Sequence, residues 1–226
     1  MAFAWAGRRA LAARRFRPFR TVMQLIAENV SIGRGERMLF GPCSFRVEAG
    51  RALEVTGPNG SGKSTLLKTL VGFVAPLGGR IRLEGASTAH PIAEQCHYLG
   101  HRDAVRGTLT VGENVRFWCR FLGGSDGAHE AAVERFGLSG LAHVPAAYLS
   151  AGQRRRLALT RLLAAERPLW LLDEPAASLD AAGTEVLRQV MAAHLAKGGL
   201  LIAATHVTLA LPAAIELRLG DGAGTA

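Results

Sequence analysis

The stretch that decides the fold is Gly57-Pro58-Asn59-Gly60-Ser61-Gly62-Lys63-Ser64-Thr65. It fits the pattern G-x-x-x-x-G-K-[ST], the phosphate-binding P-loop. Its glycines allow a tight turn in which successive backbone N–H groups point at phosphate oxygens. A strand-like run precedes the loop and a helix-like run follows it, so the positive end of a helix would face the same anion. We therefore predict a strand–loop–helix unit that binds a nucleotide through its phosphates.

Two side chains of this loop have predicted roles. Lys63 would reach the β- and γ-phosphates as a point charge. The hydroxyl of Ser64 would be a ligand of Mg²⁺, which prefers oxygen donors.

Two acids follow an apolar run farther along the chain. Leu169–Leu172 is predicted to be a buried strand, and Asp173 and Glu174 follow it directly. In open α/β sheets, ligands bind at the carboxyl ends of the strands. We expect Asp173 to hold Mg²⁺ through water, and Glu174 to orient or deprotonate the attacking water. Many strands end in acids, so this interpretation depends on the P-loop upstream.

Strand-like and helix-like segments alternate along the chain, which favours an α/β fold with a largely parallel sheet. The predicted strands are Val22–Glu28, Cys43–Val47, Ala52–Thr56, Ile81–Glu84, Cys96–Leu99, Leu169–Leu172, Leu200–Ala204 and Ile215–Leu219. The predicted helices are Lys63–Phe73, Val111–Phe121, His129–Phe136, Ala151–Ala165 and Ala181–Ala196. Residues 103–150 lack strong strands, so we expect a helical subdomain there, within one domain of residues 23–220 that a tail at 221–226 follows.

Charge limits the classes of function. The net charge is +9, and six arginines with no acid lie in residues 1–22: Arg8, Arg9, Arg14, Arg15, Arg17 and Arg20. Three interpretations of this basic leader stay open: a mitochondrial transit peptide, a tail that touches anionic lipid, or an extension before a true start at Met23. The rest of the chain carries only +3, so we expect no nucleic-acid partner. No run approaches the ~20 apolar residues of a membrane-spanning helix.

A third motif indicates the family. Leu149-Ser150-Ala151-Gly152-Gln153 resembles the LSGGQ signature of ABC ATPases, with Ala151 in place of a glycine. The order of the motifs is also similar to that family, since Ser178-Leu179-Asp180 resembles the D-loop and Thr205-His206 resembles the switch histidine. The resemblance implies the ABC-ATPase form of the P-loop NTPase fold, with a RecA-like parallel-sheet core, an antiparallel β edge and a helical subdomain. It also implies ATP and Mg²⁺ as ligands.

The same resemblance implies a homodimer. Two ATP-binding domains would face each other head to tail, so that each ATP lies between the P-loop of one copy and the signature of the other. Ser150, Gly152 and the N-terminus of the following helix would then contact the γ-phosphate. Glu174 and His206 would be catalytic, and Asp180 would help to link the two sites. Loss of the γ-phosphate would open the dimer and drive a membrane partner.

Some positions depart from the family pattern. His101 holds the place of the Q-loop glutamine; it could contact Mg²⁺ through one neutral nitrogen, and the alternative is a solvated loop histidine. Arg34 holds the place of the aromatic residue that stacks on adenine; its guanidinium can stack on a base, and Phe40 or a solvated Arg34 are the alternatives. The run Arg154-Arg155-Arg156 is expected to be the exposed face of the helix after the signature.

Several runs are similar to the CcmA group, the ATP-binding subunits of the haem exporter of cytochrome c biogenesis. These runs are Arg37-Met38-Leu39-Phe40, Tyr98-Leu99-Gly100-His101, Leu109-Thr110-Val111-Gly112-Glu113-Asn114 and Pro168-Leu169-Trp170. The resemblance implies CcmB- and CcmC-like permease partners at the cytoplasmic face of the inner membrane. Haem, as the transported substrate, is implied by this resemblance alone. The alternatives are the ATPase of another small bacterial ABC exporter, and a soluble ABC ATPase that acts on nucleic acid or ribosomes.

Overall fold

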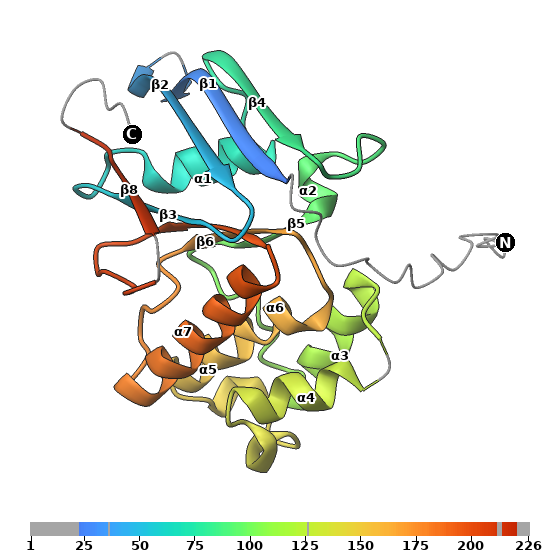
Figure 1. Ribbon diagram of the computed structural model, residues 1–226. Coiled ribbons are helices and arrows are strands. Elements are labelled where there is room, and N and C mark those ends of the chain that lie inside the picture. Colours follow the sequence, from blue (N-terminus) through green and yellow to red (C-terminus); the bar gives the residue numbers. More distant parts are fainter. Residues whose placement is uncertain (1–22, 36, 126, 212–213, 221–226) are drawn as a thin grey trace, which may run out of the picture.

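The computed structural model describes residues 23–35, 37–125, 127–211 and 214–220. Its elements form layers (Figure 1): an antiparallel sheet, helix α1 beneath it, a parallel sheet, and helices on the far side of that sheet. The predicted leader at 1–22 and the tail at 221–226 lie outside the described residues. The α/β class with a largely parallel sheet is confirmed.

The parallel sheet carries the functional loops. Its strands are β5 (Cys96–Leu99), β6 (Leu169–Asp173), β7 (Leu200–Ala204), β3 (Ala52–Thr56) and β8 (Ala214–Arg218), hydrogen-bonded in that order. Strand β7 and residues 169–172 of β6 are continuous apolar runs because both faces of the sheet are covered. Strand β3 is buried as well, although it carries Glu54. Leu99 pairs with Leu172, and Asp173 pairs with Ala204, so the carboxyl ends of these strands lie level.

Alternation along β6 assigns its residues to two cores. Leu169 and Leu171 pack with the α1 side, whereas Trp170 and Leu172 pack with the helical side. Because successive side chains of a strand point to opposite faces, Asp173 falls on the same face as Leu171. That face carries the P-loop.

The antiparallel strands form a sheet of their own, with the order β2-β1-β4, instead of extending the edge of the parallel sheet. They are β1 (Gln24–Arg34), β2 (Arg37–Glu48) and β4 (Gly78–Glu84). Helix α1 (Lys63–Val71) lies between the two sheets (Figure 1), and its buried leucines share a core with residues of both. The hairpin of β1 and β2 is longer than predicted, since residues 29–42 were not expected to be strand.

Helices cover the other face of the parallel sheet. They are α3 (Val111–Leu122), α4 (Ala128–Arg135), α5 (Ala151–Leu159), α6 (Arg161–Ala164) and α7 (Ala181–Ala196), and a short helix α2 (Ile92–Gln95) precedes β5. The single helix predicted for 151–165 is wrong, because it breaks at Thr160, whose hydroxyl donates to the carbonyl of Leu157 (2.6 Å). None of the helices in the described part of the chain is long and apolar enough to cross a membrane. The proposed limits of a helical subdomain stay a prediction.

Candidate functional site

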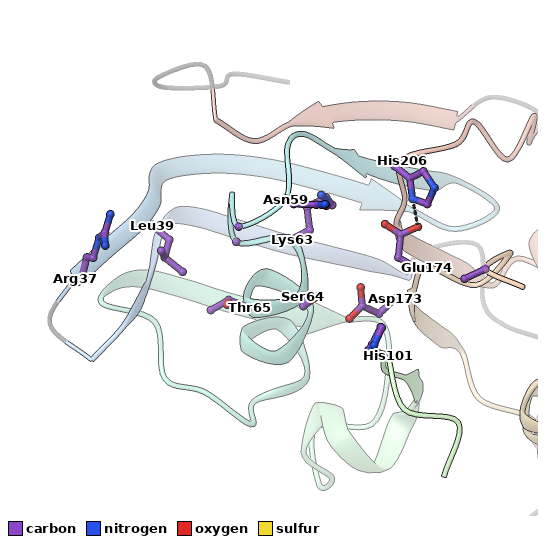
Figure 2. Close-up of a pocket in the computed structure, with 13 residues that line it drawn as sticks. Arg37, Leu39, Asn59, Lys63, Ser64, Thr65, His101, Asp173, Glu174 and His206 are labelled. Carbon is purple, nitrogen blue, oxygen red and sulfur yellow. Dashed lines mark hydrogen bonds and ion pairs between the residues drawn. The ribbon is translucent and has the colours of Figure 1, made fainter. Parts of the chain in front are cut away.

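Four neighbouring parallel strands deliver their following residues to one cavity. The P-loop follows β3, His206 follows β7, Glu174 follows β6 and His101 follows β5. The cavity has a volume of about 790 Å³. It is lined by Arg37, Leu39, Asn59, Gly60, Gly62, Lys63, Ser64, Thr65, His101, Asp173, Glu174, Ala177 and His206 (Figure 2). The structure thus brings the predicted P-loop, acids and histidines together.

The P-loop has the backbone that its glycines predict. Gly57, Gly60 and Gly62 have φ angles of 131°, 84° and 103°, in the left-handed region that favours glycine. A side chain at Gly57 would run into the carbonyl oxygen of Leu219, so close packing also requires glycine there. Helix α1 starts directly after the loop, with the Leu66 amide donating to the carbonyl of Gly62 (2.7 Å).

Lys63 bends back over its own loop. Its Nζ donates to the carbonyl oxygens of Gly57 (2.7 Å) and Pro58 (3.1 Å), which leaves the ammonium at the cavity wall. The hydroxyl of Ser61 is buried and makes no hydrogen bond within the described residues. Six of the nine predicted P-loop residues line the cavity; Gly57, Pro58 and Ser61 belong to the loop but not to its lining.

The two acids differ in their surroundings. Asp173 ends β6 and is 3% exposed. Glu174 leaves the strand with a φ of 47°, while its amide donates to the carbonyl of Ala204 (2.8 Å). Its carboxylate Oε2 lies 2.7 Å from Nδ1 of His206, as Figure 2 shows. This contact joins the ends of two neighbouring strands.

The signature residues do not line this cavity. Ser150 and Gln153 form a capping box at the start of α5: the Gln153 amide donates to the Ser150 hydroxyl (3.2 Å), and the Ser150 amide donates to Oε1 of Gln153 (2.9 Å). Leu149 is buried in the helical core. Only Ala151 of the motif borders a neighbouring cavity of about 170 Å³. Within one copy, therefore, the signature does not face the P-loop cavity.

The D-loop residues lie between β6 and α7. Ser178 borders the smaller cavity and has a φ of 63°. Leu179 packs against the helical core. Asp180 caps α7 by accepting the amide of Gly183 (2.8 Å). Their predicted role in linking two sites stays a prediction.

The expectations for adenine stacking have different outcomes. Arg34 is the last residue of β1, and its side chain lies outside what the structure describes. Phe40 is wrong as the alternative, because it is 6% exposed and packs in the core under the antiparallel sheet. Instead, Arg37 and Leu39 of β2 line the cavity. Sequence reasoning missed both, although their alternation with Phe40 along a strand could have indicated them.

The expected exposed arginine face is wrong at its central residue. Arg155 is 4% exposed, and Arg154 and Arg156 are only partly exposed. His101 borders both cavities and is exposed, so its contact with Mg²⁺ stays a prediction beside the alternative of a solvated loop histidine.

Comparison with known proteins identifies the family of this chain. The family model described as "ABC transporter" matches residues 40–177. The chain is 49% identical over 201 residues to the cytochrome c biogenesis ATP-binding export protein CcmA of Nitrobacter winogradskyi, covering 89% of this chain and 100% of that protein. It is 49% identical over 203 residues to the CcmA protein of Rhizobium meliloti, covering 87% and 98%.

A solved structure has the same fold. The dimeric ATP-binding cassette in a post-hydrolysis state, bound to ADP and phosphate, has a TM-score of 0.73 and 22% identity, covering 86% of this chain and 96% of that one. The fold and the cavity define an ABC-type ATP-binding domain. The chain belongs to the ABC transporter family, in the group of the cytochrome c biogenesis ATP-binding export proteins. The resemblance inferred from the motifs is confirmed, and with it the class of ATP-hydrolysing transporter subunit.

Proposed function

We propose that this chain hydrolyses ATP to drive the permease of a haem exporter in cytochrome c biogenesis. The observation that carries the proposal is the convergence of Lys63, Glu174 and His206 from three adjacent strand ends on one cavity. The names of the relatives support cytochrome c biogenesis and export. The assignment of haem as the transported substrate rests on the family resemblance.

The loop before α1 would hold the phosphates. Its left-handed glycines let successive amides face an anion, and the N-terminal end of α1 adds a favourable dipole. The ammonium of Lys63 would exchange the carbonyls of Gly57 and Pro58 for phosphate oxygens, since it attracts an anionic oxygen more strongly than a neutral carbonyl oxygen.

The residues at the cavity fit Mg²⁺. This ion prefers a few protein oxygens and takes its other ligands from phosphates and water. Ser64 and Asp173 line the same cavity with a hydroxyl and a carboxylate. Within the described residues no cluster of three His, Cys, Asp or Glu could hold a metal ion. Mg²⁺ would therefore need ligands from the phosphates and from water in addition to the protein. When bound, Mg²⁺ would neutralise charge on the phosphate oxygens. His101 borders this place and is the further candidate ligand.

Glu174 would be the general base. Its carboxylate opens onto the cavity and can accept a proton from a water held next to the γ-phosphate. The oxygen of that water would then bond to phosphorus while the bond to the ADP oxygen breaks. His206, held by Oε2 of Glu174, would keep the carboxylate in place and hydrogen-bond the γ-phosphate.

A second copy would complete the site. The signature residues Leu149, Ser150, Ala151, Gly152 and Gln153 lie apart from the P-loop cavity of their own chain. The amides at the start of α5 would therefore reach an ATP bound by the partner copy. The related cassette was solved as a dimer bound to ADP and phosphate. Ser178, Leu179 and Asp180 would lie between the two sites.

The permease partner would hold this dimer at the cytoplasmic face of the inner membrane. CcmB- and CcmC-like subunits are the partners that the family resemblance suggests. The test is complementation of a bacterial strain that lacks its own CcmA. The chain should restore c-type cytochromes on a haem-stained gel, and Lys63→Ala should not, whereas Lys68→Ala, on the exposed side of the same helix, should. Restoration by Lys63→Ala, or failure of the native chain despite expression at the membrane, would refute the proposal.

A further inference from the structure

One guanidinium lies buried at the junction of three functional segments. Arg155 projects from α5, the helix that starts at the signature, and its side chain is 5% exposed. Its Nη2 donates to the carbonyls of Asp173 (3.1 Å) and Glu174 (2.6 Å), and its Nε donates to the carbonyl of Pro175 (3.2 Å). Three consecutive carbonyls thus converge on one side chain.

These carbonyls belong to the turn that aims Glu174. With a φ of 47°, Glu174 adopts a left-handed backbone conformation that is strained for a residue with a side chain. Such a conformation persists when its surroundings hold it. A planar guanidinium can satisfy several carbonyls at fixed angles, which an ammonium cannot do. Arg155 is therefore built to hold this turn.

The same guanidinium reaches the loop after β5. Its Nη1 lies 2.9 Å from Oδ1 of Asp103, which pairs the buried charge. Asp103 lies two residues after His101, which borders the ATP cavity. The smaller cavity of about 170 Å³ lies at this junction, bordered by Asp103, Arg155 and Glu174.

We propose that Arg155 is a positioning residue that couples the signature helix and the His101 loop to the carboxylate of Glu174. A shift of α5, when a partner copy's ATP meets its N-terminus, moves the guanidinium and with it the carbonyls of the catalytic turn. Hydrolysis thereby depends on the state of the signature in the same chain. This inference rests on the proposed role of Glu174 as general base.

The test compares Arg155→Lys with the native full-length chain. Lysine keeps the charge but loses the planar fork, so kcat for ATP should fall about ten- to a hundredfold because the base is misplaced. The Kd for ATP should change by less than about threefold, because Arg155 touches no phosphate site. The matched control is Arg188→Lys on α7, an exposed arginine with two hydrogen bonds to Glu185, which should keep the native kcat.

A double variant separates positioning from general damage. In the Glu174→Gln background, Arg155→Lys should lower the residual single-turnover rate no further, since the group that it positions is already gone. Additive losses, or equal losses in kcat and ATP affinity, would overturn the proposal. So would a native kcat in Arg155→Lys.

If Arg155→Lys does not fold, Asp103→Asn tests the proposed coupling in its place. It weakens the ion pair at a partly exposed carboxylate and should lower kcat with little change in Kd for ATP; an unchanged kcat would count against the coupling. The two proposals fail differently. Native hydrolysis in Glu174→Gln would refute the proposed base, whereas an inactive Glu174→Gln beside a fully active Arg155→Lys would refute only the positioning role.

Discussion

The imidazole of His206 and the carboxylate of Glu174 meet with 2.7 Å between Nδ1 and Oε2. The histidine follows β7 and the glutamate follows β6, so the contact bridges the ends of two paired strands. The side chain of His206 is 66% exposed and that of Glu174 is 24% exposed, so both are open to a ligand in the cavity.

Replacement of Glu174 by glutamine should separate binding from hydrolysis. Glutamine keeps the shape and a hydrogen bond to His206 but cannot accept a proton. ATP hydrolysis should therefore fall by at least ~100-fold, measured as phosphate release, while ATP still binds and a dimer persists in size-exclusion chromatography. Glu185→Gln, at an exposed position of α7, is the control and should hydrolyse normally. Normal hydrolysis by Glu174→Gln would show that another group acts as the base.

Removal of the Lys63 ammonium should abolish tight nucleotide binding. A hydrogen bond to a charged group contributes about 1.5–3 kcal/mol, and Lys63 would make more than one to the phosphates. Lys63→Ala should raise the Kd for Mg·ATP by at least ~100-fold in isothermal titration calorimetry. Lys68→Ala, five residues farther along α1 and exposed, should bind as the native chain does. Equal affinity of the two variants would contradict the P-loop assignment.

Two glycines of the P-loop should differ in their tolerance of alanine. Both have positive φ, so each substitution costs about 1–2 kcal/mol of backbone strain. A methyl group at Gly57 also meets the backbone of Leu219, whereas one at Gly60 meets nothing within 4 Å. Gly57→Ala should therefore lower the free energy of unfolding by about 1 kcal/mol or more beyond Gly60→Ala, measured by urea denaturation. The reverse order would contradict the described loop.

Loss of the Asp173 carboxylate should appear first in the dependence on Mg²⁺. Asp173→Asn keeps the size of the side chain but provides a weaker ligand for a hard cation. The Mg²⁺ concentration for half-maximal hydrolysis should rise, and chelation of Mg²⁺ by EDTA should stop hydrolysis in both proteins. An unchanged Mg²⁺ titration would remove Asp173 from the metal site.

Acid should destabilise the protein through two buried histidines. Burial lowers the pKa of His194 to about 4 and that of His97 to about 3. In the unfolded chain a histidine titrates near pH 6.5, so below that pH the unfolded state binds more protons than the folded one. The stability present above about pH 6.5 is therefore lost as the pH falls toward 4. For His194 the loss amounts to about 3 kcal/mol.

Urea denaturation between pH 7.5 and pH 4.5 measures this slope. His194 stacks on Trp170 with ring centroids 3.9 Å apart, so His194→Gln also costs packing at every pH. Its distinctive effect is a flatter dependence of the unfolding free energy on pH. Equal slopes in the native chain and His194→Gln would contradict the prediction.

Local patterns predicted the elements that carry the chemistry. The glycines of the P-loop and the acids after Leu172 follow from backbone geometry and from the rule that ligands bind at strand ends. The hairpin of β1 and β2 was underestimated because Gly33, Gly35, Gly41 and Pro42 are typical turn residues. In the fold, Gly33 instead allows close packing against Leu77 and the carbonyl of Arg37. That requirement comes from tertiary contacts, so it cannot be inferred from the neighbouring residues in the sequence.

The role of Arg155 was hidden for a similar reason. A run of three arginines is typical of a solvated helix face, and nothing in Arg154-Arg155-Arg156 distinguishes the central residue. Its burial follows from carbonyls about twenty residues away in the chain. Likewise, the alternation with Phe40 indicates only that Leu39 faces away from the core; its place at the cavity also depends on the path of β2 past the P-loop, which is a tertiary relationship.

The alignment of β6 with β7 has a consequence for evolution by insertion and deletion. One extra residue within Leu169–Asp173 would turn every later side chain to the opposite face, because a strand has a period of two. Leu172 would then occupy the position from which Asp173 faces the ATP cavity, and the carboxylate would point into the apolar core on the helical side of the sheet. Residues 169–172, which do not line the ATP cavity, therefore constrain the site through their number alone.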